Sequence, residues 1–423
     1  MTPEGWTIPT LGDVADVAIG GTPARNNPAY WDPEKRSGNR WVAISDLKDR
    51  VVAETAEQIS ALGVQKSNVK LVRAGTPIMS FKLSIGRIAL AGRDLYTNEA
   101  IAAFRVRGSL DPVFLLYALP RTAELHGEAD VAVKGKTLNK AKLVDLPLLL
   151  PPLPEQRKIA AILTSVDEAI EGAQTVIDQL QVVKKAMMAD LLTRGIPGRH
   201  KKFKQTEIGE VPEKWEVVPL GDLLDGINAG WSPQCESRPA GPKEWGVLKV
   251  SAVSWGEFRQ EENKLLPSSL VPREEIEVRS GDILVSRANT PELVGRAVIV
   301  RATRSQLMLC DKIFRLRTDQ TKVDSAYLNL VLGSPNSRAQ IQDGASGSSR
   351  SMKNISQEKL RNVLVQRPAL AEQRQIAVGI DALADRVVEE KAVLASLSAL
   401  KSALMSVLLT GEVRVRVAEG VSA

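Results

Sequence analysis

The segment "LPPLPEQRKIAAILTSVDEAI", residues 150–170, decides the architecture of this chain. Pro151 and Pro152 keep the incoming backbone extended, and Pro154 suits the first turn of a helix, where its missing N–H needs no partner. A long proline-free amphipathic run follows and predicts one long helix. A second version, "RPALAEQRQIAVGIDALADRV" at 367–387, predicts another helix of the same kind.

The two helical segments have equal lengths between matching points. Glu155 precedes the first Leu of "LLT" by 191 − 155 = 36 residues, and Glu372 precedes the second "LLT" by 408 − 372 = 36 residues. A helix tolerates substitutions but not a change of length if both of its ends must hold fixed positions. The equal spacing therefore indicates that these segments provide length.

Apolar residues in both segments repeat every seven positions. The first series is Ile159, Val166, Ala173, Leu180 and Met187 with Leu163, Ile170, Ile177 and Leu191; the second is Ile376, Leu383, Leu397 and Leu404 with Ile380, Val387, Leu394 and Leu408. An apolar stripe left in water would promote aggregation, so we expect the two helices to bury their stripes against each other. Glu390 interrupts the second series and Gly379 stands in the position of Ile162, which predicts looser packing there. A helix buried in a bundle would also carry a stripe, but it would not explain two copies of equal length.

The rest of the chain also contains an internal sequence repeat. The matching pairs are "WTIPTLGD" (6–13) with "WEVVPLGD" (215–222), "VRAGTPIMS" (72–80) with "VRSGDILVS" (278–286), and "AAFRVR" (102–107) with "KIFRLR" (312–317). Short apolar runs punctuated by Gly and Pro predict strands in both copies. We predict an α+β chain with an internal pseudo-two-fold repeat of two similar, strand-rich mixed α/β domains. The predicted parts are a first domain at 1–150, a long helix at 151–197, a linker and second domain at 198–366, a second long helix at 367–412 and a tail at 413–423.

The composition of the 423 residues is that of a soluble globular protein, with 43% hydrophobic and 25% charged residues. The longest apolar run, 143–153, is broken by Asp145 and by prolines, and the first residues do not resemble a secretory signal. We therefore expect a cytoplasmic protein without a membrane span. Two cysteines and two histidines exclude a disulfide framework and a cysteine-rich zinc site, and we expect no metal.

Motifs for catalysis are absent or incomplete. "NPAY" at 27–30 approaches the Asn-Pro-Pro-aromatic signature of adenine methyltransferases, but Ala29 replaces the second proline. "VKGKT" at 133–137 resembles the end of a phosphate-binding loop, but Asp130 stands where an upstream glycine is required. No glycine-rich loop between a strand and a helix is available for a cofactor. We predict no catalytic residue and no cofactor.

Cations gather in two segments at matching positions. "AVKGKTLNKAK" (132–142) and "SGSSRSMKNISQEKL" (346–360) precede the long helices, with Lys136 and Lys353 both 19 residues before their glutamates (155 − 136 and 372 − 353). A short helix is expected to begin after each, capped by Asn139 or Ser356. Cations, flexible backbone and a helix start suit phosphate oxygens. The candidate DNA-binding residues are Lys134, Lys136 and Lys140 in the first segment and Ser349, Arg350 and Lys353 in the second. A capped surface helix with ordinary solvated lysines is the alternative.

Further candidate DNA-binding residues lie in two pairs of loops. The hairpin loop at 80–87 offers Lys82 and Arg87, its counterpart at 286–296 offers Arg287, Asn289 and Arg296, and a weaker pair at 20–25 and 230–234 adds Gly21, Thr22 and Arg25. Arginine can bind guanine and asparagine can bind adenine through paired hydrogen bonds. The loops differ between the copies while the flanking strands agree, which fits two readers of different half-sites or simple loop drift. The basic run at 199–204 is either a solvated linker or lies near a phosphate backbone.

These residues resemble the specificity subunits of type I restriction–modification enzymes over essentially the whole chain. The resemblance rests on "PPLPEQRKIAAIL", "LLTRGIP", "HKKFKQTEIGEVPEKWEVVPLGD" and the degenerate second "AEQRQIA". It implies two target-recognition domains that each read half of a split, asymmetric duplex DNA sequence, separated by an antiparallel two-helix coiled coil. It also implies partners, namely methylation subunits similar to adenine methyltransferases (two of them) and motor-nuclease subunits, and a chain that is itself not catalytic.

The chain departs from the family pattern in its second copy. Ala369 and Ala371 stand opposite Pro152 and Pro154, so we expect a different approach to the second helix. Recognition domains are the variable part of the family, so the resemblance transfers no base contacts. Two rival functions remain: a coiled-coil scaffold that joins two protein-binding modules without nucleic acid, and a self-sufficient methyltransferase. Salt-sensitive DNA binding would exclude the first, and failure to bind a methyl donor would exclude the second.

Overall fold

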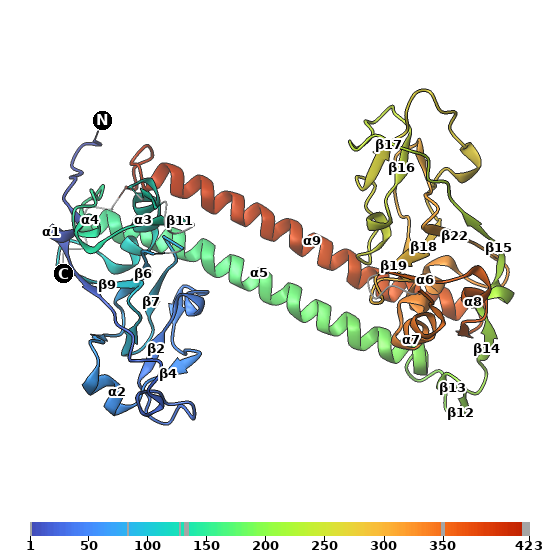
Figure 1. Ribbon diagram of the computed structural model, residues 1–423, viewed down its shortest axis with the longest axis horizontal. Helices are drawn as coiled ribbons and strands as arrows, with labels where there is room; N and C mark the ends of the chain where they lie inside the picture. The colour runs from blue at the N-terminus through green and yellow to red at the C-terminus, as the bar shows by residue number, and fades with distance from the viewer. Residues whose placement is uncertain (1, 83, 127, 131–134, 348–351, 417–423) are drawn as a thin grey trace. The chain divides into compact units, whose positions relative to one another are not determined.

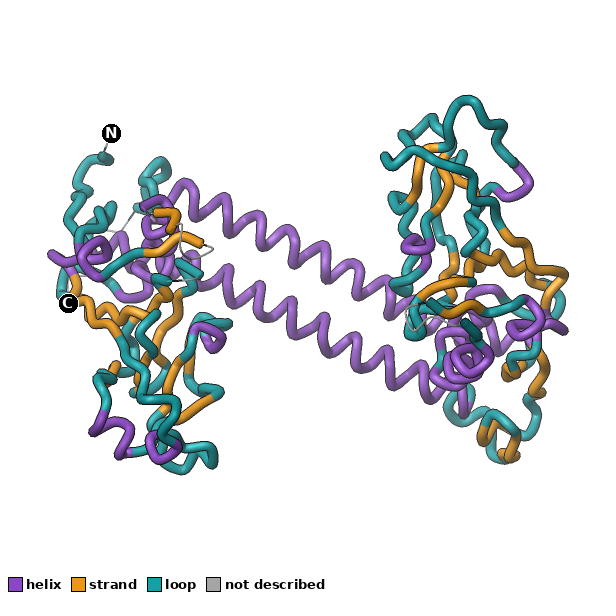
Figure 2. Tube along the Cα trace, in the orientation of Figure 1, coloured by secondary structure: helices purple, strands orange, loops and turns teal. Residues whose placement is uncertain are grey.

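The computed structural model describes residues 2–416 except 83, 127, 131–134 and 348–351. The chain divides into two compact units. Unit 1 is Met1–Thr175 with Lys391–Ala423, and unit 2 is Val176–Glu390. Both divisions fall inside long helices, α5 (Leu153–Arg194) and α9 (Leu370–Leu408), which are uninterrupted in the trace (Figures 1 and 2). Each unit therefore contains one strand-rich domain and a segment of both helices.

Unit 1 is built on two mixed sheets. The first has the strand order β1 (Ala15–Ile19), β9 (Ile101–Val106), β6 (Pro77–Ser80), β7 (Ile88–Ala91) and β3 (Val51–Val52); the second has β4 (Glu57–Gln58), β2 (Arg40–Val42), β8 (Leu95–Thr97) and β5 (Leu71–Val72). The pairs β3–β7 and β2–β8 are parallel and the other pairs are antiparallel. The helices are α1 (Leu11–Val14), α2 (Ala61–Lys66), α3 (Pro112–His126) and α4 (Lys140–Val144), with the 3₁₀ turns η1 (Pro28–Tyr30) and η2 (Ile44–Asp46) and the ribbon β10 (Glu128–Asp130) and β11 (Gly135–Thr137).

Unit 2 repeats this plan. Its main sheet has the order β15 (Leu224–Ala229), β22 (Ile313–Thr318), β18 (Ile283–Ser286) and β20 (Ala297–Ile299), and a second sheet has β17 (Asn263–Leu265), β16 (Gly246–Leu248) and β21 (Leu307–Met308). Three ribbons pair β12 (Phe203–Thr206) with β13 (Gly209–Pro212), β14 (Glu216–Pro219) with β24 (Leu364–Arg367), and β19 (Ala288–Asn289) with β23 (Lys353–Asn354). The helices are α6 (Ser325–Gly333), α7 (Pro335–Gly344) and α8 (Gln357–Arg361), with the 3₁₀ turns η3 (Leu220–Leu223), η4 (Val250–Val253) and η5 (Glu274–Ile276).

The predicted fold class is confirmed. The order β1-β9-β6-β7 in unit 1 matches β15-β22-β18-β20 in unit 2, and the parallel pair β2–β8 matches β16–β21. The sequences "VRAGTPIMS" and "VRSGDILVS" form the equivalent strands β6 and β18. The repeat seen in the sequence is therefore a repeat of structure.

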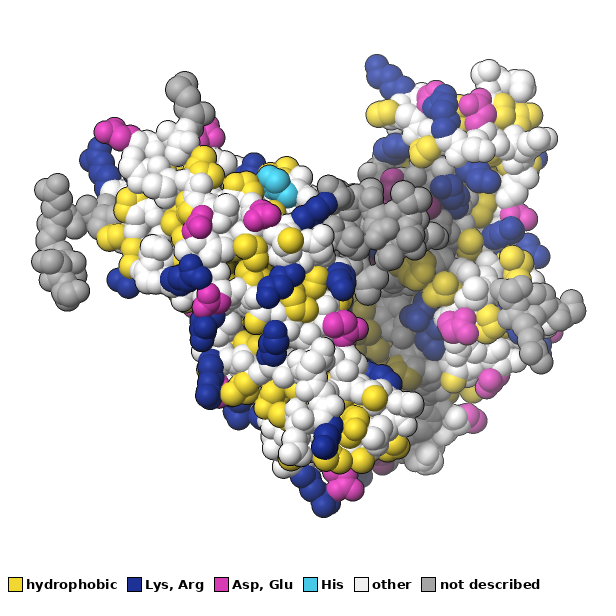
Figure 3. Space-filling model, turned by 60° about the vertical axis from the view of Figure 1, so that its left-hand side comes forward, with side chains coloured by type: hydrophobic (Ala, Val, Ile, Leu, Met, Phe, Trp, Pro, Cys, Tyr) yellow, Lys and Arg dark blue, Asp and Glu magenta, His cyan; other side chains and the backbone are white. Residues whose placement is uncertain are grey.

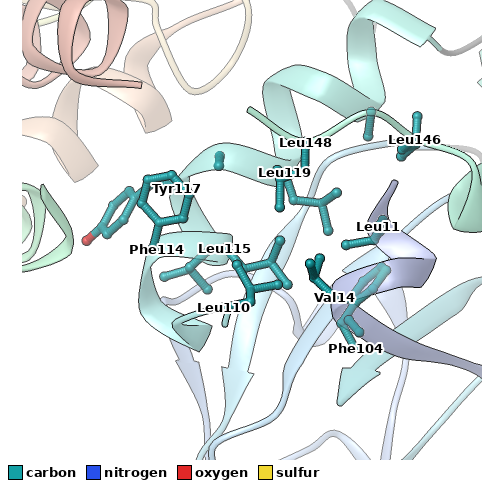
Figure 4. Packing of buried hydrophobic residues seen from close by; sticks show 14 of the residues in the cluster. Leu11, Val14, Phe104, Leu110, Phe114, Leu115, Tyr117, Leu119, Leu146 and Leu148 are labelled. Atoms are coloured by element: carbon teal, nitrogen blue, oxygen red, sulfur yellow. The ribbon is translucent and has the colours of Figure 1, made fainter. Parts of the chain in front are cut away.

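The core of unit 1 joins the domain to both long helices. Figure 4 shows Leu115 and Leu119 of α3 directed toward Leu11 and Val14 of α1. The same buried cluster includes Ile159 and Leu163 from α5 and Leu408 and Leu409 from α9. The end of one helix and the start of the other thus belong to a single core, and burial of this apolar surface stabilises them together.

The predicted heptad stripes are buried or partly buried along both helices. The expected weak point at Gly379 is filled, because Met187 of α5 lies beside it. A β-carbon at position 379 would lie 3.1 Å from Met187 Cε, so the glycine makes room for the longer side chain. The side chain of Glu390 is 12% exposed and binds Arg386 at 2.5 Å. Both irregular positions of the second helix therefore have specific neighbours: Gly379 packs against Met187, and Glu390 pairs with Arg386.

Helix α9 is apolar enough by length and composition alone to cross a membrane, since an 18-residue window within it has a mean hydropathy of 1.4. We expected no such segment from the sequence. Only 6% of that window is buried, and Val393 and Leu400 are 48% exposed on it. In unit 1 this helix carries Lys401, whose ammonium lies 2.6 Å from Asp167 of α5. Helix α9 therefore packs one face against α5 and leaves a second, largely apolar face exposed to solvent.

A buried glutamine at the start of each long helix fastens it to the domain. Gln156 is 0% exposed, accepts from the Asp111 amide at 2.8 Å and donates to the carbonyls of Ser109 and Pro151 at 2.9 and 2.8 Å. In unit 2, Gln373 accepts from the Asp324 amide at 2.9 Å and donates to the carbonyls of Lys322 and Pro368 at 3.2 and 2.8 Å.

The preceding glutamate is buried as well. Glu155 accepts from Trp6 Nε1 at 3.1 Å and from both Arg414 Nε and Arg414 Nη2 at 2.9 Å. Glu372 accepts from Trp215 Nε1 at 3.3 Å, and His200 Nε2 lies 2.7 Å from its Oε1. In each unit, the segment that follows one long helix thus supplies a side chain, Arg414 or His200, that pairs with the glutamate at the start of the other helix. The repeated Glu-Gln pair is explained by these bonds.

The two helices also begin alike, contrary to the expected difference in approach. Helix α9 begins at Leu370, which matches Leu153 because both precede their glutamates by two residues. The Gln373 amide donates to Ala369 O at 3.1 Å, as the Gln156 amide donates to Pro152 O at 3.0 Å. The same glutamine bonds position both helices, so the prolines are not required for this geometry.

Replacing Gln373 with alanine is expected to lower the free energy of unfolding of unit 2 by about 2–3 kcal/mol, because the Asp324 amide and two carbonyls lose their buried partner. Gln179→Ala, at an exposed position of α5, is the matched control and should change little. Urea denaturation and amide hydrogen exchange of α6 measure the effect. Equal behaviour of the two variants would contradict this role.

Replacing Arg414 with alanine is expected to make unit 1 less stable at neutral pH and to shift its acid unfolding to higher pH. Burial raises the pKa of Glu155, but hydrogen bonds from Arg414 and Trp6 outweigh burial and lower it overall. The contribution of Glu155 is therefore complete above the pKa of an unfolded glutamate, about 4.3, and is lost as the pH falls through the lower folded pKa. The loss of stability should be present at pH 7 and should shrink in acid. Arg416→Ala is the exposed control, and a pH-independent difference would contradict the pairing.

Candidate nucleic-acid interface

The strand register of unit 1 brings its candidate loops to one edge of the main sheet. Ile19 of β1 pairs with Ala102 of β9, and Ser80 of β6 pairs with Ile101. The loops that leave β1 and β6 therefore begin side by side. This places the segment with Gly21, Thr22 and Arg25 at the same edge as the loop with Lys82 and Arg87.

The third candidate segment joins this edge through the backbone. The amide of Leu138 donates to Phe81 O at 3.0 Å, next to Lys82. Lys140 is exposed at the start of α4, and Asn139 caps that helix as predicted by accepting from the Lys142 amide at 2.9 Å. Lys136 lies on β11, and Lys134 lies outside the described residues. The structure thus brings together three segments that are far apart in the sequence.

Unit 2 has an equivalent edge. Ala229 of β15 pairs with Phe314, and Ser286 of β18 pairs with Ile313. Arg287 follows directly, and its carbonyl accepts from the Ile355 amide at 2.9 Å. The predicted cap is present, because Ser356 accepts from the Lys359 amide at 3.1 Å.

The short ribbon β19–β23 pairs Asn289 directly with Lys353. The structure therefore brings together Arg287, Asn289 and Lys353, while Ser349 and Arg350 lie outside the described residues.

The side chains of unit 2 differ in their freedom to bind a ligand. Arg287 is exposed and donates to Asp311 O at 3.3 Å. Asn289 donates to Ser254 Oγ at 2.9 Å and accepts from the Thr290 amide at 2.9 Å, so its amide already organises the loop. A bidentate contact with adenine would require Asn289 to leave these partners.

Arg296 faces the interior in part. Its Nε is buried without a partner among the described residues, as is Nη1 of the neighbouring Arg338. Burial, together with the charge of Arg296, lowers the pKa of Arg338 to about 10. Arg296 therefore lies at the base of the loop, beside a second cation, and is less available than Arg287.

Both edges contain a hydroxyl–carboxylate pair that the sequence did not reveal. Thr22 Oγ1 donates to Glu99, and Ser232 Oγ donates to Asp311. The glycines just before them have no room for a side chain, because a β-carbon would lie 2.1 Å from Thr97 O at Gly20 and 2.2 Å from Leu309 O at Gly230. The loop after the first strand is therefore held against the sheet in the same way in both units. The shared Gly and hydroxyl residues in "GGTP" and "GWSP" were the available signal.

Arg25 is held by aromatic rings and an acid. Its guanidinium lies 3.8 Å from the ring centroid of Trp31 and 4.7 Å from that of Trp41, and it binds Glu57 at 2.5 and 3.0 Å. The Arg25 side chain is still 52% exposed. Unit 2 has a counterpart in Arg273, which lies 4.2 Å over Trp231. Such stacking fixes the direction of a guanidinium.

The other sequence motifs have local roles. Asn27 of "NPAY" accepts from the Ala29 amide at 3.1 Å and caps η1. In the basic run, Arg199 donates to Gln375 at 2.8 Å, and Lys204 lies on β12. No group of three or more His, Cys, Asp or Glu side chains suited to a metal occurs in the part of the chain that the structure describes.

The visible face of unit 1 carries Lys and Arg side chains interleaved with apolar ones, without a single continuous basic surface (Figure 3). A net charge of +6 over 423 residues agrees with this scattered pattern. The candidate interface is thus defined by the converging loops and not by bulk charge.

Comparisons with known proteins repeatedly find the same family. Residues 3–182 match the model of the type I restriction modification DNA specificity domain. The type I restriction enzyme EcoEI specificity subunit of Escherichia coli is 40% identical over 174 residues, which cover 41% of this chain and 29% of that protein. The MjaVIII specificity subunit of Methanocaldococcus jannaschii is 25% identical over 98% of this chain and 94% of its own length.

The fold is shared with a solved chain from a study of complex assembly and conformational transition of the type I restriction–modification system. That chain superimposes with a TM-score of 0.58 at 19% identity, covering 98% of this chain and 100% of its own. Two strand-rich domains and two long helices that pack together in each unit are common features. By sequence over residues 3–182 and at lower identity along almost its whole length, and by fold, the chain is similar to the specificity subunits of type I restriction–modification enzymes.

Proposed function

We propose that this chain recognises a bipartite, asymmetric duplex DNA target, with residues 1–150 reading one half-site and residues 198–366 reading the other. The observation that carries this proposal is the convergence of matching loops at the same edge of two equivalent sheets. The strands that carry the loops have the same arrangement in both units, but the side chains in the loops differ. Lys82 and Arg87 occupy the loop of unit 1, where unit 2 has Arg287 and Asn289. Different donors and acceptors on the same frame suit different base sequences.

The proposal assigns two kinds of contact to these loops. Exposed lysines and backbone amides suit phosphate oxygens, which position a protein on DNA without reading its sequence. Arg25 and Arg287 are directed by neighbouring groups and suit base edges. The scaffold without nucleic acid is the alternative, and it predicts no salt-sensitive DNA binding.

The long helices, expected at 151–197 and 367–412, are proposed to serve as the spacer and to carry the partner subunits. Their outward faces leave large apolar side chains exposed, among them Val182 (69%), Val183 (50%), Val378 (69%), Val388 (66%) and Leu400 (48%). A cavity of about 610 Å³ lies along α5 in unit 2, with Met188, Leu192 and Pro335 in its lining. Exposed apolar surface of this extent marks a protein-binding site.

We assign these faces to methylation subunits, two for a chain with two copies of the same plan, with motor-nuclease subunits completing the complex in the cytoplasm. The fold similarity to a chain from a study of type I complex assembly supports this assignment. In this proposal the partner subunits carry out the methylation and cleavage, and this chain directs them to the DNA target.

Exchanging residues 14–140 for the same region of a related subunit is expected to change one half-site of the methylated motif and to leave the other unchanged. The reason is that each set of loops belongs to one unit. Mapping of methylated adenines in cells with the gene, without it and with the exchanged version measures the outcome. A folded exchange variant that altered both half-sites would contradict separate reading, and an unchanged methylome after deletion would contradict the function.

Removing both lysines in Lys136→Ala with Lys353→Ala is expected to weaken binding of the assembled complex to duplex DNA and to flatten its salt dependence by about two units on a log–log plot, one for each lost phosphate contact. Lys158→Ala with Lys214→Ala removes two exposed lysines elsewhere as a control. Fluorescence anisotropy across a salt series provides both values. Identical slopes for the two double variants would assign Lys136 and Lys353 to ordinary solvated surface.

A further inference from the structure

Trp255 is a large aromatic side chain that unit 2 leaves in solvent. Trp255 is 60% exposed, whereas the preceding Ser254 is 4% exposed. Gly256 follows with φ +84, and a β-carbon there would meet nothing within 4 Å. Trp255 therefore stands at a turn that opens to solvent. An exposed indole presents a rigid, largely apolar ring that a binding partner can contact.

The position of Trp255 is fixed by the candidate DNA-binding loop. Ser254 Oγ accepts from Asn289 Nδ2 at 2.9 Å, and it also donates to Val250 O at 2.8 Å. Asn289 is paired with Lys353 across β19 and β23. The turn with the exposed ring is thus bonded to the ribbon that carries two of the predicted DNA-binding residues.

Unit 1 has no aromatic ring at the equivalent place. Trp41 of β2 and Val247 of β16 occupy equivalent positions. Trp41 pairs in parallel with Tyr96, three residues before Glu99, and Val247 pairs in parallel with Met308, three residues before Asp311. Counting onward by the same offset, 247 − 41 = 206, puts Asp49 opposite Trp255. The exposed ring is therefore not required by the shared frame, and it distinguishes the second domain from the first.

We propose that Trp255 is a DNA-contacting residue of the second domain and that its ring packs against a base of the half-site which that domain reads. This inference rests on the proposed function. Lys353 is a cation suited to a neighbouring phosphate, and an indole supplies the apolar face that bases and thymine methyl groups accept. A ring without charge adds affinity for bases without adding a phosphate contact.

The test compares Trp255→Ala with Trp255→Phe in the complex of this chain with its methylation subunits. The probe is a fluorescent duplex that carries the motif identified by methylation mapping. Loss of the ring should weaken binding to that duplex roughly 5- to 150-fold, as expected for loss of one base–aromatic contact. Phenylalanine should retain most of the affinity. The salt slope should stay unchanged, because no ion is released by the ring.

Val271→Ala is the matched control, since Val271 is an exposed apolar residue of unit 2 at 82%. A second readout is permanganate reactivity of thymines in the bound duplex, which should depend on Trp255 in one half-site only. Unchanged affinity and reactivity in Trp255→Ala would overturn the inference. Loss of complex assembly on gel filtration with intact DNA affinity would also overturn it, because the ring would then belong to a protein contact. If the unsubstituted complex shows no preference for the mapped duplex, the proposed function itself fails.

Discussion

Burial of a Glu-Gln pair at the start of each long helix is the constraint on which the rest of the structure depends. In both units the glutamine binds the turn before the domain helix, and the glutamate binds a tryptophan and a second side chain, Arg414 in unit 1 and His200 in unit 2. The glutamates, glutamines and tryptophans of this network are buried, so an unmade bond is costly. A strand-rich domain is therefore fastened to the helix in a fixed direction, and its loops at the far sheet edge inherit that direction. Ion pairs add to this fastening, with Arg301 2.5 Å from Asp381 in unit 2.

The two units then hold their helix pairs in different ways. In unit 1 the hydroxyl of Tyr117 points away from the apolar cluster (Figure 4) and donates to Asp167 at 2.7 Å, and Asp167 also binds Lys401. Burial raises the pKa of Tyr117 to about 12. The residue of α9 that matches Asp167 is Ala384 (167 + 217), and unit 2 instead places Met187 beside Gly379. A buried polar network specifies one helix alignment, whereas close packing specifies the other.

The sequence predicted the features that depend on local pattern. Heptads, equal spacing and cap residues predicted α5, α9 and the capped starts of α4 and α8, and the matched segments predicted the repeated sheets. The long helices are α5 at Leu153–Arg194 and α9 at Leu370–Leu408. What the sequence could not supply were partners from distant segments. Glu99, Asp311 and the two rings around Arg25 acquire their roles only when the sheets form. For the same reason the inward position of Arg296 and the bonds that occupy Asn289 could not be foreseen.

In the proposed function, the length of the two long helices sets the distance between the two half-sites. A direct test inserts one copy of the adjacent heptad after Thr175 in α5 and another after Glu390 in α9, where the two units divide. Seven inserted residues keep the apolar stripe in register and lengthen each of the two helices by about 10 Å. At about 3.4 Å per base pair, the two halves of the methylated motif should move apart by about three base pairs. Mapping of methylated adenines reads the spacing, with both half-site sequences expected to stay the same. An active double-insertion variant that still methylates the original spacing would contradict the account.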